Sequence, residues 1–298
     1  MKAYKKKSFR VFLGIGFALL LLYTLSLFIP LLWTLFTSFK RRLEFIEKPF
    51  GFPEVWKLSN YGTVFEYLNV PINIMKNGEI VSRRDVGLAE LIYNAVFFTA
   101  GCTATHTLVP CITAYAVAKY RYRFSSVVYA LVIVAMVFPV VGSLPSEMQI
   151  VRALGFYDSM AGVWIMKGTF LGTNFLIYYA AFKGIPWSYA EAAEIDGASH
   201  FRIMTTIMIP LISKTVAAIG LLSFITYWNE YQTVMLYLPS SPTLSYGLYR
   251  FQFSSEQAIN YVPVQLAACI VVSIFPIILF AFTKNMLMGN VALGGIKG

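Results

Sequence analysis

Six long apolar runs, separated by more polar stretches, constrain this chain more than any other feature of its sequence. A helix needs about 20 apolar residues to cross the hydrocarbon core of a bilayer. Only 13% of the 298 residues are charged, against about 25% in soluble globular proteins. The runs cover residues 11–36, 89–118, 127–145, 161–182, 207–229 and 263–283. We therefore predict an all-α polytopic membrane protein with six transmembrane helices.

Two of these runs contain residues that disturb helices. Pro139, Gly142 and Pro145 lie in the third run, and Lys167 and Gly168 interrupt the fourth. Membrane bundles tolerate such breaks where neighbouring helices or a water-filled cavity satisfy the freed backbone groups. We therefore expect both runs to cross the membrane.

The basic residues predict which side of the membrane each segment faces. Basic flanks beside apolar runs are typical of cytoplasmic segments. Residues 1–10 hold Lys2, Lys5, Lys6, Lys7 and Arg10. We predict a cytoplasmic basic N-terminus at 1–10, a transmembrane domain at 11–298, outer loops at 37–88 and 231–262, and a cytoplasmic C-terminus. The net charge of +10 is then explained by topology, so no nucleic-acid partner is expected.

The outer loop 37–88 contains one local signal. Asn77-Gly78 lies between two short stretches of alternating residues. Asn-Gly favours the backbone conformation of a two-residue hairpin turn, so a β-hairpin is one interpretation. A flexible surface loop is the other, and the sequence does not separate them.

The polar loop 184–210, between the fourth and fifth runs, predicts two short helices. Ser188 and Glu191 have the spacing of a capping box, and Gly197 is expected to end the first helix in the left-handed conformation. Ser199 can cap the second helix. Helices this short are marginal in water, so the element needs a surface to dock against. An ordinary connector resting on lipid headgroups is the alternative.

This loop resembles the EAA loop of ABC importer permeases, whose pattern is Glu-Ala-Ala, three residues, Gly, nine residues, Ile, one residue, Leu-Pro. The matching positions are Glu191, Ala192, Ala193, Gly197, Ile207, Ile209 and Pro210, with Ile209 in place of Leu. Residues 94–124, 223–230 and the C-terminal Gly-Gly-Ile-Lys-Gly are similar to maltose-type carbohydrate permeases. The likeness covers about 85–298 and the first run, and residues 69–87 look like an insertion.

The resemblance implies a role for the loop. In that family the EAA loop forms a coupling helix that sits in a groove of an ATP-binding subunit. The residues implied in ATPase coupling are Ser188, Glu191, Ala192, Ala193, Asp196, Gly197 and Arg202. The implied partners are a second permease subunit, usually a different chain, two ATP-binding subunits, an extracellular solute-binding protein and the lipid of a bacterial plasma membrane.

Catalytic and metal-binding motifs are missing from the sequence. No phosphate loop ending in Gly-Lys-Ser or Gly-Lys-Thr occurs, so we expect no enzyme activity and no cofactor here; ATP and magnesium would bind the partner subunits. Cys102, Cys111 and Cys269 lack metal or disulfide spacing. His106 and His200 stand alone, without the pairing of a zinc site. We expect His106 to be a hydrogen-bonded packing residue, with a proton relay as the alternative.

The implied function is one half of the translocation pathway of an ATP-driven importer for a sugar or oligosaccharide. A permease for another solute, such as glycerol phosphate or a peptide, is the alternative. An ion-coupled secondary transporter is disfavoured, because it would place charged residues deep within its spans.

Two further sites follow from side-chain chemistry on the outer side. Tyr227, Trp228, Asn229 and Glu230 combine aromatic faces with hydrogen-bonding groups, as a sugar pathway needs. The alternative for the aromatic residues is the interfacial belt. In the outer loop, Tyr249, Arg250, Phe251, Gln252 and Phe253 resemble the loop that contacts the solute-binding protein, and aromatic and Arg side chains are enriched at interfaces.

Overall fold

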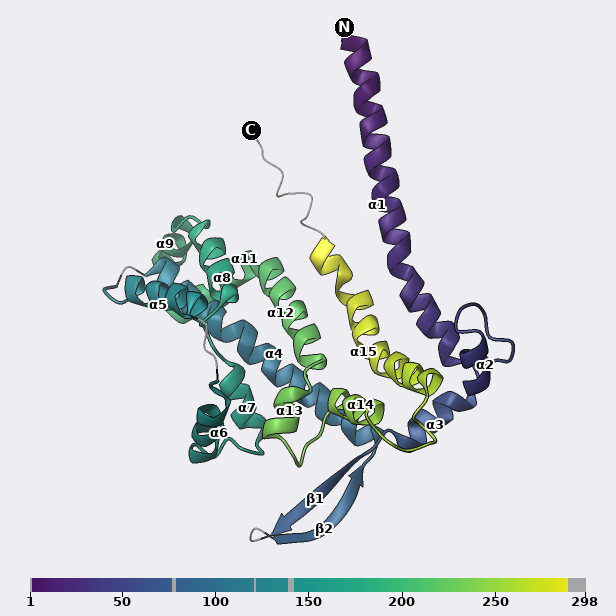
Figure 1. Ribbon diagram of the computed structural model, residues 1–298. Helices are drawn as coiled ribbons and strands as arrows, with labels where there is room; N and C mark the ends of the chain where they lie inside the picture. Colours follow the sequence, from purple (N-terminus) through teal and green to yellow (C-terminus); the bar gives the residue numbers. More distant parts are fainter. Residues whose placement is uncertain (1, 77–78, 121, 139–141, 289–298) are drawn as a thin grey trace. The chain divides into compact units, whose positions relative to one another are not determined.

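The computed structural model describes residues 2–76, 79–120, 122–138 and 142–288 (Figure 1). Its elements are α1 Lys2–Ser38, α2 Arg42–Glu47, α3 Ser59–Tyr67, β1 Val70–Lys76, β2 Glu79–Val86, α4 Leu88–Lys119, α5 Ser125–Val137, α6 Leu144–Ala153, α7 Met160–Lys167, α8 Thr173–Lys183, α9 Ser188–Ile195, α10 His200–Ile203, the π-helix η1 Met204–Met208, α11 Ile209–Leu211, α12 Ser213–Trp228, α13 Gln232–Tyr237, α14 Leu244–Gln252 and α15 Val262–Met288. The described chain is mostly helical, as predicted.

The chain divides into two compact units. One unit comprises Met1–Leu68 and Leu248–Ser273, and the other comprises Asn69–Gly247 and Ile274–Gly298. The second unit holds the segment that resembles the EAA loop. Within it, α4 is the central helix and contacts α7, α8 and α12.

Three helices of the described chain are long and apolar enough to cross a membrane. They are Phe9–Ser38 within α1, Leu88–Lys119, which is α4, and Val262–Phe282 within α15. These helices agree with the first, second and sixth apolar runs.

The third and fourth runs, 127–145 and 161–182, are each broken into two helices, as their helix-disturbing residues allow. Helix α5 ends at Val137, and α6 starts at Leu144 with Pro145 in its first turn. The stretch 139–141 lies outside the described residues. In the fourth run, α7 ends at Lys167 and α8 starts only at Thr173. Both interruptions occur where the sequence places proline or glycine, residues that favour helix ends.

The fifth run, 207–229, is also broken. The helical stretch His200–Leu211 and helix α12 meet at an angle of 79°. Pro210 has no backbone N–H to donate, and its ring clashes with the carbonyl four residues earlier in a regular helix. The π-helix Met204–Met208 directly precedes this position. The π-helix thus lies in the turn that Pro210 disturbs, whereas the bend itself follows Leu211, at Ile212.

An antiparallel pair of strands occupies the part of the chain that looked like an insertion (Figure 1). Val70 pairs with Val86 and Ile74 with Ser82, with a shift in register between Ile74 and Met75. Asn77 and Gly78 lie outside the described residues. The Arg84 guanidinium donates two hydrogen bonds, of 2.8 and 2.7 Å, to the carboxylate of Glu90 in α4. This ion pair ties the strands to the central helix of their unit.

The two predicted outer loops also contain regular structure. Helices α2 and α3 lie within 37–88, and α13 and α14 lie within 231–262. Both segments between the apolar runs therefore contain short helices. These segments have too few consecutive apolar residues for a transmembrane helix. Short helices can form without an apolar run of that length.

Candidate functional site

The segment from α9 to α10 forms two helices around one glycine. Gly197 adopts φ +78, the left-handed conformation that glycine takes without steric cost. The N–H of Ala198 donates to the carbonyl of Ala193 at 2.9 Å, which closes the end of α9. Ser199 Oγ then accepts from the N–H of Arg202 at 3.4 Å and caps α10. Both predictions, for the glycine and for the Ser199 cap, are confirmed.

The predicted capping box of Ser188 and Glu191 is wrong. The N-cap of α9 is Trp187, and no side chain caps this end. The Trp187 carbonyl accepts from the N–H groups of Ala190 and Glu191, at 2.8 and 3.2 Å. Because the helix starts one residue earlier than a Ser188 cap requires, the Ser188 hydroxyl lies inside the first turn.

The inner face of this segment packs into the core of its unit. Ala190 and Ala193 of α9 and Ile203 of α10 are buried there, together with Tyr115 and Phe182. Alanine has a side chain small enough to bring the helix backbone close to these aromatic rings. The alanine pattern is therefore explained by packing on one side of α9.

The same segment is joined to the end of α4 by contacts that sequence reasoning missed. The Lys119 Nζ donates to the Ile185 carbonyl at 2.5 Å. The Tyr120 ring lies edge-on to Trp187 and His200, with centroids 5.8 and 5.6 Å away. The sequence signal for these contacts is the stretch of basic and aromatic residues after the second apolar run. From the sequence alone, that stretch is interpreted only as evidence of membrane topology. A displacement of α9 would therefore be transmitted directly to α4.

The outer face of the segment is exposed and partly apolar. Ile195 is 86% exposed and Phe201 is 72% exposed, on either side of Gly197. Glu191, Ala192, Asp196 and Arg202 are exposed as well. Exposed apolar side chains gathered at one place are typical of a surface that meets a partner. We call the segment from α9 to α10 a projection, because its inner face is anchored in the core of its unit, and we call the exposed side chains of Ile195 and Phe201 its apolar tip.

The residues predicted for a substrate pathway have different surroundings. Tyr227 is buried edge-on to His106, with ring centroids 5.5 Å apart, and Trp228 stacks on Phe275 at 4.5 Å. Asn229 is exposed, whereas Glu230 accepts a hydrogen bond of 3.0 Å from the N–H of Thr233 at the start of α13. Of these four residues, Asn229 is exposed, Glu230 is half-buried, and Tyr227 and Trp228 are buried in the described structure.

The His106 ring has the role expected for a packing residue. Its Nδ1 lies 3.2 Å from the carbonyl oxygen of Lys167, at the end of α7. Among the described residues, no group of three or more His, Cys, Asp or Glu side chains is placed to hold a metal ion.

The residues predicted to contact a binding protein lie at the end of α14 and just beyond it. Phe251 is only 3% exposed, whereas Phe253 is 74% exposed. The rings of Tyr249 and Phe253 lie 5.0 Å apart. Arg250 and Gln252 are exposed, and the Gln252 amide contacts the Cys269 sulfur at 3.3 Å. Phe251 is thus a packing residue, whereas Arg250, Gln252 and Phe253 are exposed.

Residues 106–287 match the family described as binding-protein-dependent transport system inner membrane component. This match includes the whole α9–α10 segment and covers more than half of the chain. The chain belongs to this family. The resemblance to ABC importer permeases is thereby confirmed.

Similar proteins extend the match to almost the whole permease. It is 24% identical to the diacetylchitobiose uptake system permease protein NgcG of Streptomyces coelicolor, over 97% of this chain and 90% of that protein. It is 26% identical to the probable starch degradation products transport system permease protein AmyC of Thermoanaerobacterium thermosulfurigenes, over 99% of both chains. A solved bacterial ABC transporter involved in the import of alginate has a chain with 23% identity and a TM-score of 0.72, covering 94% of this chain and 97% of that one. The last match shows a shared fold.

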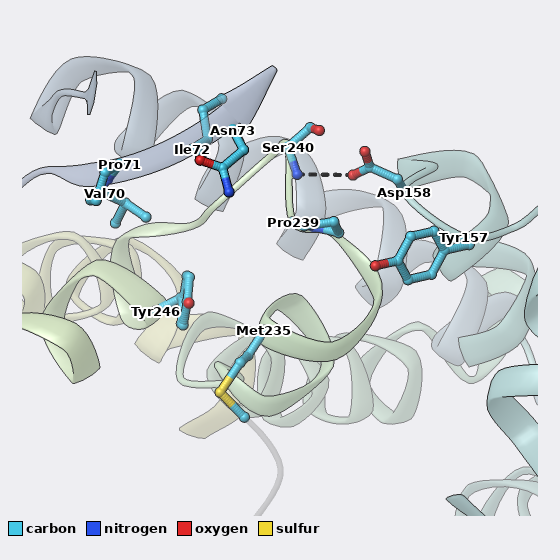
Figure 2. A pocket seen from close by; sticks show the side chains of 10 residues that line it. All are labelled: Val70, Pro71, Ile72, Asn73, Tyr157, Asp158, Met235, Pro239, Ser240 and Tyr246. Carbon is cyan, nitrogen blue, oxygen red and sulfur yellow. Dashed lines mark hydrogen bonds between the residues drawn. The ribbon is translucent and has the colours of Figure 1, made fainter. Parts of the chain in front are cut away.

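The permease also has a pocket beside its strand pair, with a volume of about 360 Å³. Figure 2 shows the side chains of Asn73 and Tyr157 on opposite sides of it. Asp158 has φ +57, which is uncommon for a residue with a side chain. Its N–H donates to the Tyr237 carbonyl at 2.8 Å, and its carboxylate accepts from the N–H of Ser240 at 3.0 Å. These bonds hold the turn before α7 against the chain after α13 and fix the pocket wall.

Proposed function

We propose that this permease forms half of the translocation pathway of an ATP-driven importer for a sugar or oligosaccharide. The observation that carries the proposal is the α9–Gly197–α10 projection, anchored in the core and tipped with exposed apolar side chains. In this proposal the projection is a coupling helix that docks on an ATP-binding subunit. The names of the similar carbohydrate permeases support the class of substrate.

The proposal includes the membrane topology and the partners. Six crossings would be made by α1, α4, the helices around 125–145, the broken pair α7 and α8, the bent pair ending in α12, and α15. The termini and the coupling projection would face the cytoplasm of a bacterial cell. A second permease, two ATP-binding subunits that bind ATP and magnesium, and an external solute-binding protein would complete the transporter.

Energy coupling provides the direct test of this function. Uptake of a sugar bound by the partner binding protein should stop when cellular ATP is depleted and continue when an ionophore collapses the ion gradients. The ligand itself can be found by thermal-shift screening of that binding protein against sugars. Uptake that follows the ion gradient would contradict the proposal, and stabilisation by amino acids, ions or glycerol phosphate alone would contradict the substrate class.

Asn229 is proposed to line the outer part of the pathway. Its amide Nδ2 donates to the Ile225 carbonyl at 2.8 Å, which is a local bond, so Asn229→Ala should fold normally. We expect slower uptake, because one hydrogen-bonding group for a sugar hydroxyl is lost. Thr226→Val is a matched control, since the Thr226 hydroxyl donates to the Leu222 carbonyl at 2.9 Å in the same way. Equal uptake rates in the two variants would remove Asn229 from the pathway.

Phe253 is proposed to contact the solute-binding protein. Phe253→Ser should raise the concentration of binding protein needed for half-maximal stimulation of ATP hydrolysis, because an exposed aromatic anchor is lost. Truncation of such an anchor costs about 2 kcal/mol or more where it is a hot spot. The basal ATPase rate and the melting temperature should stay unchanged. Val81→Ser, on β2, removes another exposed apolar side chain and serves as the control; the same response in both variants would refute the specific contact.

A further inference from the structure

The C-terminal end of α1 extends beyond the hydrocarbon core of a bilayer. The apolar stretch Phe9–Ser38 has 30 residues. At a rise of about 1.5 Å per residue it is about 45 Å long, whereas the hydrocarbon core is about 30 Å thick. If the helix is centred, the last turns of α1 lie about 7 Å into the headgroup region.

The chain that follows folds back against these last turns. The Trp33 Nε1 donates to the Pro49 carbonyl at 2.9 Å. The Phe50 ring lies 6.4 Å from the Trp33 ring, and the Phe52 ring lies 4.6 Å from that of Phe36. These contacts set the rings of Phe50 and Phe52 at the same depth as the end of α1.

Hydrogen bonds hold this returning segment in a fixed shape. The buried Asn60 side chain donates to the carbonyls of Ser38 and Lys40, at 2.7 and 2.9 Å. The buried Lys40 ammonium donates to the Lys48 carbonyl at 2.8 Å. These bonds tie the segment 42–58 to the end of α1 at two places, at Lys48 and just beyond the segment at Asn60. The segment therefore cannot move away from that depth without breaking them.

The same residues expose much more apolar surface than an aqueous loop requires. Six large apolar side chains are each more than half exposed: Leu43, Ile46, Phe50, Phe52, Trp56 and Leu58. Leu43 and Ile46 are three residues apart on α2, so they share one face of that helix. Leucine, phenylalanine and tryptophan on one face are typical of segments that lie in the membrane interface.

Charged side chains form the other part of the segment. A concavity of about 380 Å³ is lined by Arg41, Arg42, Glu44, Glu47, Lys48, Glu54 and Lys57, together with Leu43 and Val55. Lys48 and Glu54 form an exposed ion pair. The hydrogen bond from Lys48 lowers the pKa of the Glu54 carboxyl. Beside this ion pair, the lining has three further basic side chains, Arg41, Arg42 and Lys57, and two further acidic ones. This excess of basic groups suits lipid phosphates.

We propose that residues 42–58 form an interfacial collar, which lies in the boundary between the headgroups and the acyl chains at the C-terminal end of α1. Its apolar side chains enter the acyl region, and its basic side chains meet the phosphates. The occupant of this surface is therefore lipid, as continuity with a membrane-crossing helix requires. The collar would fix the depth and tilt of α1 in the bilayer.

Spin-label depth measurements test this directly. The full-length permease, with its three cysteines replaced and a nitroxide on Phe50→Cys, is placed in lipid nanodiscs without ATP. Oxygen concentrates in the bilayer and a nickel chelate stays in water, so the ratio of their collision rates reports depth. We expect oxygen collisions to exceed nickel collisions several-fold. A label on Val81→Cys, which replaces an exposed apolar residue of β2, should show the reverse.

The Phe50→Cys substitution removes a ring that contacts Trp33. A second label is therefore placed on Leu43→Cys, a substitution that removes no ring contact. Collision with nickel at least equal to that with oxygen at both sites would place the segment in water and overturn the proposal. Immobile labels reached by neither reagent would place it in a protein interface, which also overturns it. Because the readout uses no transport, failure of the ATP-coupled function would leave the result unaffected.

Discussion

Gly197→Val is expected to lower uptake several-fold while the permease still reaches the membrane. Gly197 has φ +78, and a Cβ added there would meet no atom within 4 Å. The cost therefore comes from the backbone alone: about 1–2 kcal/mol for an L-residue in this conformation, or about a 5–30-fold change in the population of the turn. A β-branched residue is even less favourable there. The second helix would lose its direction relative to α9, and the apolar tip would no longer fit a partner.

Two further substitutions separate this effect from general damage. Gly197→Asn should keep much of the uptake, because asparagine tolerates the left-handed conformation better than other side chains. Gly184→Ala, in the same loop, should be nearly silent, since its added Cβ meets ordinary contacts at 3.5 Å or more. The measurements are sugar uptake, ATP hydrolysis and membrane abundance. Full uptake by Gly197→Val would show that the turn has no coupling role.

Gly101→Leu is expected to destabilise the central helix packing. A Cβ at Gly101 would lie 2.0 Å from the Trp164 indole ring, so α4 and α7 could not keep their present separation. Overpacking of this kind typically costs about 1–3 kcal/mol, and occasionally more. The expected result is a clear fall in the melting temperature of the detergent-solubilised permease, with loss of the folded peak in size-exclusion chromatography.

The control for this variant is Gly16→Leu in α1, where an added Cβ meets nothing within 4 Å. It should leave the melting temperature nearly unchanged. The double variant Gly101→Leu with Trp164→Ala should recover part of the loss, because the side chain that obstructs the leucine is removed. No difference between Gly101→Leu and Gly16→Leu would contradict the packing of α4 against α7.

The features that were predicted correctly depend on residues close together in the sequence. Gly197 and Ser199 act within three residues of their own positions, through backbone conformation and one cap. The Ser188 cap failed because α9 begins at Ser188 itself, one residue earlier than that cap requires. Apolar length alone gave the first, second and sixth spans, but it did not show where Pro210 or Gly168 interrupt a helix.

The remaining features require contacts between distant residues. The bond from Lys119 to the Ile185 carbonyl joins residues 66 positions apart, and no local pattern encodes it. Likewise, Phe251 and Phe253 have the same chemistry, and only the fold decides that the first is buried and the second exposed. Composition therefore identified the class of protein, whereas the assignment of individual site residues required the structure.

The central claim is that the apolar tip beside Gly197 contacts an ATP-binding subunit, and site-specific photocrosslinking tests it most directly. A benzophenone side chain at Ile195 is activated in membranes that contain the assembled transporter, and the adduct is identified by mass spectrometry. A probe at Phe253, which is also an exposed apolar side chain, is the matched control. The account predicts that Ile195 captures the ATP-binding subunit and that Phe253 does not. Transport that continues on ATP while Ile195 yields no such adduct would contradict it.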